Sequence, residues 1–222
     1  MISPGNKTRS RDNESMSTLL PLFPLRLVAF PGNAIPLHIF EDRYKEMVGE
    51  AETAGTEFGI VLAREEGIVN AGCTVVVEKV LQRYPDGRFD VIVRGRRRFS
   101  LLSIDNGRAY LRGEVEYFDD DDWEPVTADL RERAICSWRD VRTANSSDDG
   151  EPDPEHPFLS FQLARMVGDL DFQSMILRAR SEAERLRNFV QFAQEYVPRL
   201  RYAEKMKRLA PTNGSGHTPA SL

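Results

Sequence analysis

Histidine, cysteine and lysine are the side chains from which a hydrolytic centre would be built, and this chain carries few candidates. A hydrolase needs a nucleophile with a general base beside it. Of the three histidines, His156 and His217 fall in a loop and a tail, and His38 belongs to an apolar run where a structural role is commoner. Lys45 and Lys79 fit a solvated helix face and a solvated strand, which does not support a Ser–Lys dyad. The sequence therefore predicts no catalytic residues and no enzymatic activity.

A run of arginines is the best candidate for binding by charge. Arg94, Arg96, Arg97 and Arg98 follow one another closely, and Gly95 among them would allow a backbone to approach. Guanidinium groups bind phosphates, so an RNA- or nucleotide-binding function of this cluster is one hypothesis, and it predicts a salt-sensitive interaction. The net charge of -5 and the acidic surroundings argue against a dedicated nucleic-acid binder. RNA or nucleotide binding by this cluster is therefore kept as the alternative function.

Metal and cofactor chemistry has little support in the residue spacing. The acidic run 119–122 lacks the D-x-D-x-D-G pattern of calcium loops, and we interpret it as a solvated linker. Cys73 and Cys136 form no C-x-x-C pair, so neither a disulfide framework nor a zinc site is indicated. We predict that both cysteines are small buried residues. No metal, nucleotide or organic cofactor is expected.

Length and hydropathy place the chain in a broad class. With 222 residues, 41% hydrophobic and 29% charged, it can bury one sizeable core or two small cores in contact. No stretch approaches the roughly 18 apolar residues of a membrane span, and the first residues lack a signal-peptide pattern. We therefore expect a soluble, cytoplasmic protein with no membrane partner.

The composition divides the chain into four parts. Residues 1–17 and 211–222 are polar and aperiodic and are predicted to be disordered tails. Residues 18–118 are expected to form strands with a single early helix, and residues 119–210 are expected to be helical. The acidic run marks the predicted boundary between these two subdomains.

The early helix has the clearest spacing. Tyr44, Met47, Val48 and Ala51 recur at helical intervals, and Gly55 offers a C-terminal stop. Because these four positions share one helix face, we expect them to be buried against the strands.

Five later segments are rich in β-branched or aromatic residues and are expected to be strands: 57–63, 73–84, 88–95, 97–104 and 109–118. Pro85 to Gly87 has the composition of a turn, and Asn106–Gly107 that of a tight hairpin. Many short strands joined in this way favour a closed or nearly closed barrel, which removes exposed sheet edges.

The helical part is expected to contain three helices. Leu130, Ala134, Trp138 and Val141 mark the first. Pro157 is expected to start a second that carries Leu163, Val167 and Leu170. Ser181 and Glu184 form a possible capping box for a third, which Pro198 should kink or end.

The segment LPLFPLRLVAFPGNAIPLHIFEDRYKEMV, residues 20–48, closely resembles the opening motif of the Lon N-terminal, substrate-binding domain. GCTVVVEKV and DGRFDVIVRGRRRF resemble the next two blocks of this family, so the likeness covers about residues 19–200. The resemblance implies an α+β fold: a PUA-like β-barrel followed by a C-terminal helical bundle. Lon proteases use this domain to engage substrate proteins. No G-x-x-x-x-G-K-[ST] loop is found, so we expect a free-standing module without ATPase or peptidase parts.

The resemblance implies a non-catalytic protein- or peptide-binding module that acts as an adaptor or regulator of proteolysis. Its expected partners are unfolded or extended polypeptide segments and a separate Lon-type protease. We expect a groove between barrel and helices, bordered by the first strand and the helix at Tyr44, with Phe30, Phe40 and Tyr44 as peptide contacts. Binding of RNA by the arginines and a hydrolase with a reactive Ser or Cys remain open. The sequence fixes neither the partner nor the oligomeric state.

Overall fold

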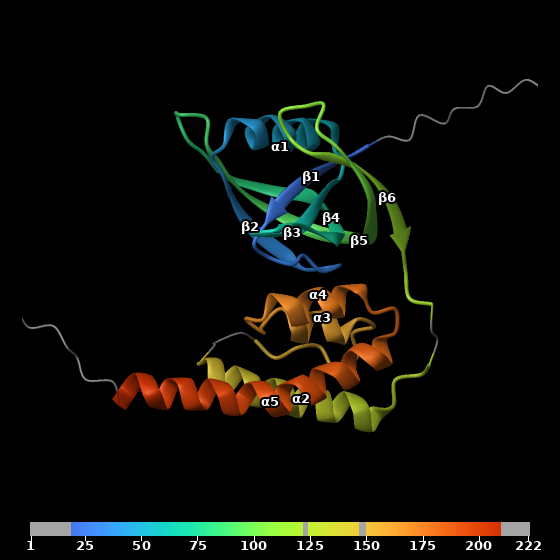
Figure 1. Cartoon of the computed structure of the whole chain (residues 1–222), viewed down its shortest axis with the longest axis vertical. Coiled ribbons are helices and arrows are strands. Elements are labelled where there is room, and N and C mark those ends of the chain that lie inside the picture. Colours follow the sequence, from blue (N-terminus) through green and yellow to red (C-terminus); the bar gives the residue numbers. More distant parts are fainter. Residues whose placement is uncertain (1–18, 122–123, 147–149, 210–222) are drawn as a thin grey trace, which may run out of the picture.

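The computed structural model describes residues 19–121, 124–146 and 150–209 of the chain. Both predicted tails lie outside the described residues, as do Asp122 and His217. Figure 1 shows a curved sheet capped by the early helix, with the later helices in a layer beneath it.

Six strands and one helix form the upper part. The strands are β1 (Leu20–Leu25), β2 (Ala34–Ile39), β3 (Phe58–Arg64), β4 (Gly67–Arg83), β5 (Phe89–Asp105) and β6 (Arg112–Phe118). Their order in the sheet is β2-β5-β4-β3-β1-β6, and β5 also pairs with β6. Strands β1 and β3 are parallel and the other pairs are antiparallel. The pairings of β1, β3, β4, β5 and β6 thus form a closed circuit, to which β2 is added at β5, and the predicted α+β class is confirmed.

Strand β5 differs most from the prediction. The segments 88–95 and 97–104 form the single strand β5, which continues through Gly95. Cys73 pairs with Arg98 and Val75 with Gly95, so that only Thr74 faces Arg96 and Arg97. This is a β-bulge, in which an extra residue lets a strand bend without ending. The break predicted between the two segments is therefore a bulge inside one strand.

The early helix α1 (Asp42–Ala54) is confirmed. Tyr44, Met47, Val48 and Ala51 are its buried residues. Gly55 ends the helix in the left-handed conformation with φ of 65°, which glycine adopts without steric cost.

The two predicted turns behave differently. Gly87 has φ of 83° and donates its backbone N–H to the carbonyl of Tyr84, so the first turn is confirmed. The tight turn predicted at Asn106–Gly107 is wrong, although β5 and β6 do form a hairpin: Asp105 pairs with Arg112, and residues 106–111 form the loop between them. Gly107 instead donates its backbone N–H to the Asp105 carboxylate, which holds a longer loop.

Four helices follow: α2 (Ala128–Asn145), α3 (Leu159–Ala164), α4 (Leu170–Arg178) and α5 (Glu182–Leu209). Helix α2 buries the four residues predicted for it. The second predicted helix is in fact two, because Asp169 accepts hydrogen bonds from the first turn of α4 and so starts a new helix there. Ser181 accepts a hydrogen bond from the backbone of Glu184, as a cap does, and α5 continues past Pro198 instead of ending there.

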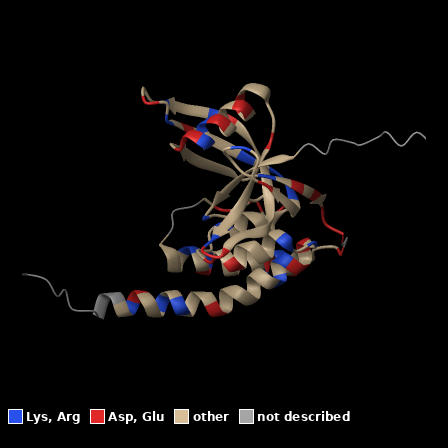
Figure 2. Ribbon diagram, turned by 45° about the horizontal axis from the view of Figure 1, so that its top comes forward, with Lys and Arg blue, Asp and Glu red and all other residues tan. Residues whose placement is uncertain are grey.

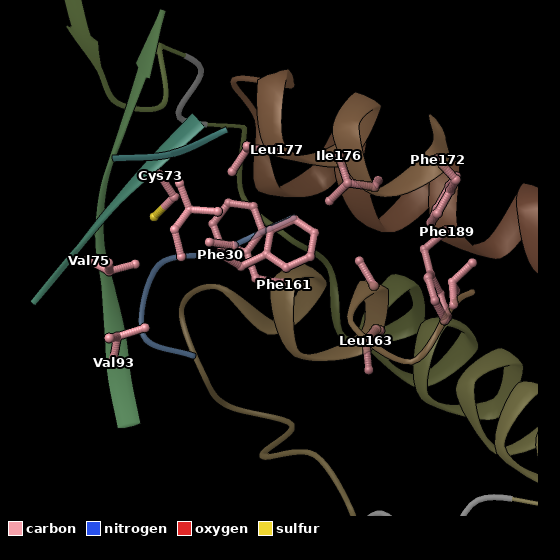
Figure 3. Close-up of a cluster of buried hydrophobic side chains, with 14 of the residues drawn as sticks. Phe30, Cys73, Val75, Val93, Phe161, Leu163, Phe172, Ile176, Leu177 and Phe189 are labelled. Atoms are coloured by element: carbon pink, nitrogen blue, oxygen red, sulfur yellow. The ribbon is translucent and has the colours of Figure 1, made fainter. Parts of the chain in front are cut away.

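One large hydrophobic core joins the sheet to the helices, and the strand residues Leu20, Leu22, Val61 and Phe99 form a second, smaller cluster. Figure 3 shows Phe30 and Phe161 side by side between the sheet and the helices, and their ring centroids are 5.3 Å apart. Cys73 is buried in this core, as predicted, but Cys136 is exposed. Cys136 lies two positions after Ala134 on α2, which turns it away from the apolar face. In the described part of the chain no helix is long and apolar enough to cross a membrane.

Candidate functional site

A groove of about 540 Å³ opens on the sheet beside β1, between the end of β2 and the start of α1. Its lining residues are Phe23, Pro24, Leu25, His38, Ile39, Phe40, Glu41, Arg43, Tyr44, Ala63, Arg64, Gly67, Ile68 and Leu111. Most of these side chains are apolar, and the charged ones are Glu41, Arg43 and Arg64. The first strand and α1 border the groove, as expected, but all of its lining comes from the sheet side and none from α2 to α5.

Phe40 is the most accessible large apolar residue of this groove. It directly follows β2, where Ile39 is buried, so the strand alternation directs Phe40 outward. Its side chain is 58% exposed, and its ring stacks on His38 with centroids 5.9 Å apart. An aromatic ring held in this way offers a rigid apolar surface to a partner.

Tyr44 forms part of the floor of the groove. The residue is buried, and its ring centroid lies 4.1 Å from that of Phe23. The guanidinium of Arg43 lies 4.7 Å above the same ring and pairs with Glu41. Burial raises the pKa of Tyr44, so the floor stays uncharged at neutral pH.

Phe30 is in a different place. It precedes β2 in the turn at Pro31 and Gly32, is 1% exposed, and packs on Phe161 of α3. In this structure its ring therefore joins the sheet to the helices and lies outside the groove.

Two strand edges border the groove. Strand β2 pairs with β5 on one side and is the end of the sheet order. Strand β1 pairs with β6 only at Leu20 and Pro21, so in the described structure Phe23 to Leu25 have a neighbouring strand on the β3 side only. Unpaired edges can accept an extended chain through backbone hydrogen bonds.

One polar residue of the groove lining, His38, is paired with Asp90 next to the groove. His38 Nδ1 lies 2.6 Å from Asp90 Oδ1, and the Tyr84 hydroxyl donates to Asp90 Oδ2 at 2.7 Å. The hydrogen bond from His38, with that from Tyr84, holds the pKa of Asp90 below its usual range. Hydrolysis would also need a nucleophile, but the groove lining includes no Ser, Thr or Cys side chain.

The described residues also hold little metal or thiol chemistry. They contain no group of three or more His, Cys, Asp or Glu side chains placed to hold a metal ion. Burial raises the pKa of the Cys73 thiol to about 12, so this cysteine stays protonated at neutral pH.

The arginine cluster is divided by the fold. Arg94 makes two hydrogen bonds to Glu78, at 2.7 and 2.9 Å, and one to the carbonyl of Gly32. Arg98 is buried and 2.6 Å from Asp120, whereas Arg96 and Arg97 are exposed at the bulge. The four arginines therefore form no single basic surface, and Figure 2 shows both signs of charge interspersed over the sheet and the helices.

A backbone does approach Gly95 closely, but it is the backbone of the turn before β2 in the same chain. A Cβ atom at this position would lie 2.0 Å from the Phe30 carbonyl oxygen. Gly95 exchanges backbone hydrogen bonds with Gly32 and Asn33. The close approach expected for a ligand is thus used to seat the turn before β2.

Asp120 is paired, although the acidic run was predicted to be a solvated linker. Its carboxylate accepts from Arg98 at 2.6 Å and from Arg185 at 2.7 Å on both oxygens. Arg185 is fully buried and also contacts Glu182, which accepts from Ser160. Burial alone would raise the pKa of Asp120, but hydrogen bonds and charge from Arg185 and Arg98 lower it below its usual value. The network ties β5 to α5, and no spacing in the sequence indicated it.

Comparison with known proteins shows which family this chain resembles. The family model of the ATP-dependent protease La (LON) substrate-binding domain matches residues 19–211. A Lon protease of Parabacteroides distasonis is 29% identical over 133 residues, which is 56% of this chain and 16% of that protein. A Lon protease of Porphyromonas gingivalis is 28% identical over 116 residues, or 48% of this chain and 14% of that protein. The chain thus spans about a sixth of these relatives.

Two solved structures share the fold. A Lon N-terminal domain protein from Xanthomonas campestris has a TM-score of 0.64 and 24% identity, with 79% of this chain and 98% of that chain covered. The N-terminal domain of a Mycobacterium avium complex Lon protease has a TM-score of 0.54 and 17% identity, with 81% and 100% covered. Sheet and helices are thus both part of the shared fold.

Proposed function

The chain belongs to the family of the substrate-binding domain of the ATP-dependent protease La (Lon), and we propose that it binds unfolded or extended polypeptide segments in the groove beside β1. The observation that carries the proposal is the exposed Phe40 at an apolar groove bordered by two open strand edges. An extended chain can pair with such an edge through its backbone, while apolar pockets hold alternate side chains.

The chemistry of the groove supports recognition of apolar segments. Phe40 offers an accessible ring, and Pro24, Leu25, Ile68 and Leu111 are partly buried beside it. Folded proteins bury such apolar side chains, so a groove of this kind distinguishes unfolded segments from native surfaces. The charged rim of Arg43 and Arg64 keeps the empty groove compatible with water.

We extend the proposal to a non-catalytic adaptor or regulator of proteolysis. Its support is the family description, which connects this domain with substrate binding for an ATP-dependent protease. In this role the module would hold a polypeptide and present it to a Lon-type protease.

Replacement of Phe40 by Ala tests the groove. We expect roughly a tenfold loss of affinity for fluorescein-labelled casein, since loss of a ring contact worth about 1.4 kcal/mol corresponds to that factor. Fluorescence anisotropy of a protein titration measures it. The melting temperature should change little, because the Phe40 side chain is 58% exposed.

Leu102→Ala is the matched control. Leu102 is also apolar and 58% exposed, but it lies on β5 outside the groove. Equal losses in the two variants would show that binding is general hydrophobic adhesion, and unchanged affinity in Phe40→Ala would exclude this groove.

A further inference from the structure

The bulge in β5 presents two arginines on the same side of the molecule. In a regular strand consecutive side chains point to opposite faces, so one of Arg96 and Arg97 would point inward. Here both are exposed, because the bulge places two residues opposite Thr74. The Thr74 hydroxyl is buried and accepts the backbone N–H of Arg97 at 3.0 Å, which fixes the irregular backbone. Bulges of this kind redirect side chains at functional sites.

These two arginines have few partners within the described part of the chain. The guanidinium of Arg97 stacks on the Tyr117 ring at 3.9 Å and makes no ion pair there. Arg96 has only a long contact of 3.9 Å with Glu57. Both can therefore donate hydrogen bonds to an anion without losing a strong ion pair.

The same arginines line a second pocket, of about 590 Å³, between the bulge and α3. Its apolar wall is formed by Pro31, Pro157, Phe158 and Phe161. Phe158 is 41% exposed and stacks on Phe161 with centroids 5.9 Å apart. The pocket thus combines a guanidinium pair with an accessible aromatic surface.

The carboxylates of this pocket limit the charge of its ligand. Asp120 and Glu182 are paired with buried arginines, and Glu124 is paired with Arg187. Asp119 is exposed at the same rim and would repel a second or third phosphate. One carboxylate attached to an apolar group matches this arrangement better than a polyanion such as RNA.

We propose that this pocket binds the C-terminal carboxylate of a polypeptide whose last side chain is apolar. The carboxylate lies against Arg96 and Arg97, and the side chain packs on Phe158. The proposal rests on the polypeptide-binding function proposed above and adds an end-specific site to it. Recognition of a chain end favours unstructured termini, because an end that is not tied down to a folded domain is free to enter a pocket.

Two fluorescein-labelled peptides test the site. They share one sequence that ends in phenylalanine and differ only in a free carboxylate or an amide at the C-terminus. We expect the free acid to bind wild-type protein roughly tenfold more tightly, because only the carboxylate can accept charge-assisted hydrogen bonds from the two guanidinium groups. Arg97→Ala should abolish this preference, and Phe158→Ala should weaken binding of both peptides. Fluorescence anisotropy at matched ionic strength gives each affinity.

Arg88→Ala is the matched control, because Arg88 is exposed on the far turn, where it pairs with Asp86, and should keep the preference. Equal affinities of acid and amide for wild-type protein would overturn the end-specific site while leaving the groove intact. If neither peptide binds, the end-specific site is overturned. Casein binding then tests separately whether the groove binds polypeptide. An unlabelled RNA oligonucleotide that displaces the free-acid peptide at equal concentration would also overturn it in favour of a phosphate site.

Discussion

At the scale of the residue, Gly95 decides how the first turn sits on the sheet. A Cβ atom there would lie 2.0 Å from the backbone oxygen of Phe30, and backbone cannot move aside as a flexible side chain can. We expect Gly95→Ala to lower the free energy of unfolding by about 1–3 kcal/mol. Urea unfolding followed by circular dichroism measures the loss.

Gly49→Ala is the control for this substitution. Gly49 lies in α1 and a Cβ there would meet nothing within 4 Å, so alanine should stabilise the helix by up to about 1 kcal/mol. Equal stability of Gly95→Ala and wild type would contradict the close packing of the turn.

Asp120 carries the second prediction at this scale. Asp120→Asn leaves Arg98 and Arg185 without their shared negative charge, and breaking a buried ion pair costs about 3–5 kcal/mol. The neighbouring Asp121→Asn removes only an exposed pair with Arg180 and should cost less than about 1 kcal/mol. Urea unfolding at neutral pH compares the two, and equal costs would count against the network.

The same network predicts acid sensitivity. The pKa of Asp120 is lower in the folded chain than in the unfolded one, so the unfolded state binds the proton more readily. Stability from this group is complete above the ordinary carboxylate pKa of about 4 and is lost as the pH falls through the lowered value. The difference in unfolding free energy between wild type and Asp120→Asn should therefore shrink in acid. A constant difference down to low pH would contradict this linkage.

At the scale of the element, the bulge depends on one buried hydroxyl. Thr74→Val keeps the shape of the side chain but leaves the backbone N–H of Arg97 without its acceptor. A buried unsatisfied donor costs about 1–3 kcal/mol, so we expect that loss in urea unfolding. Thr74→Ser keeps the hydroxyl and should retain the bulge, so its amide exchange at Arg97 should stay slow. Fast exchange in both variants would show that the hydroxyl does not hold the bulge.

At the scale of the whole molecule, the sheet and the helices share one core. Phe30 and Phe161 stack across the junction, and the buried cluster continues from β4 and β5 into α4 and α5 (Figure 3). We therefore expect a single cooperative unfolding transition in spite of the predicted boundary at residue 119. Tryptophan fluorescence and circular dichroism should give coincident midpoints, whereas two separated transitions would mean that the parts fold independently.

Local pattern determined much of this protein. The apolar spacing of α1 and α2 and the stops at Gly55 and Gly87 were sufficient to predict local elements, because these signals depend on near neighbours. The motif of residues 20–48 contributed in another way, through its resemblance to a known family. We expected a groove bordered by the first strand and by the helix at Tyr44, and both border the groove, but it lies on the sheet side and not between the sheet and the later helices.

The tertiary structure decided which of these residues meet a partner. Phe30 and Phe40 are alike in sequence, yet one is buried against α3 and the other is exposed, because burial depends on elements more than a hundred residues away. The arginine cluster was divided in the same way, since the place of Arg98 depends on Asp120 and on α5 and that of Arg96 and Arg97 on a bulge opposite Thr74. The order of residues along the chain gives the apolar periodicity of each element, but long-range packing and strand pairing decide which side chains are buried and which partners they contact.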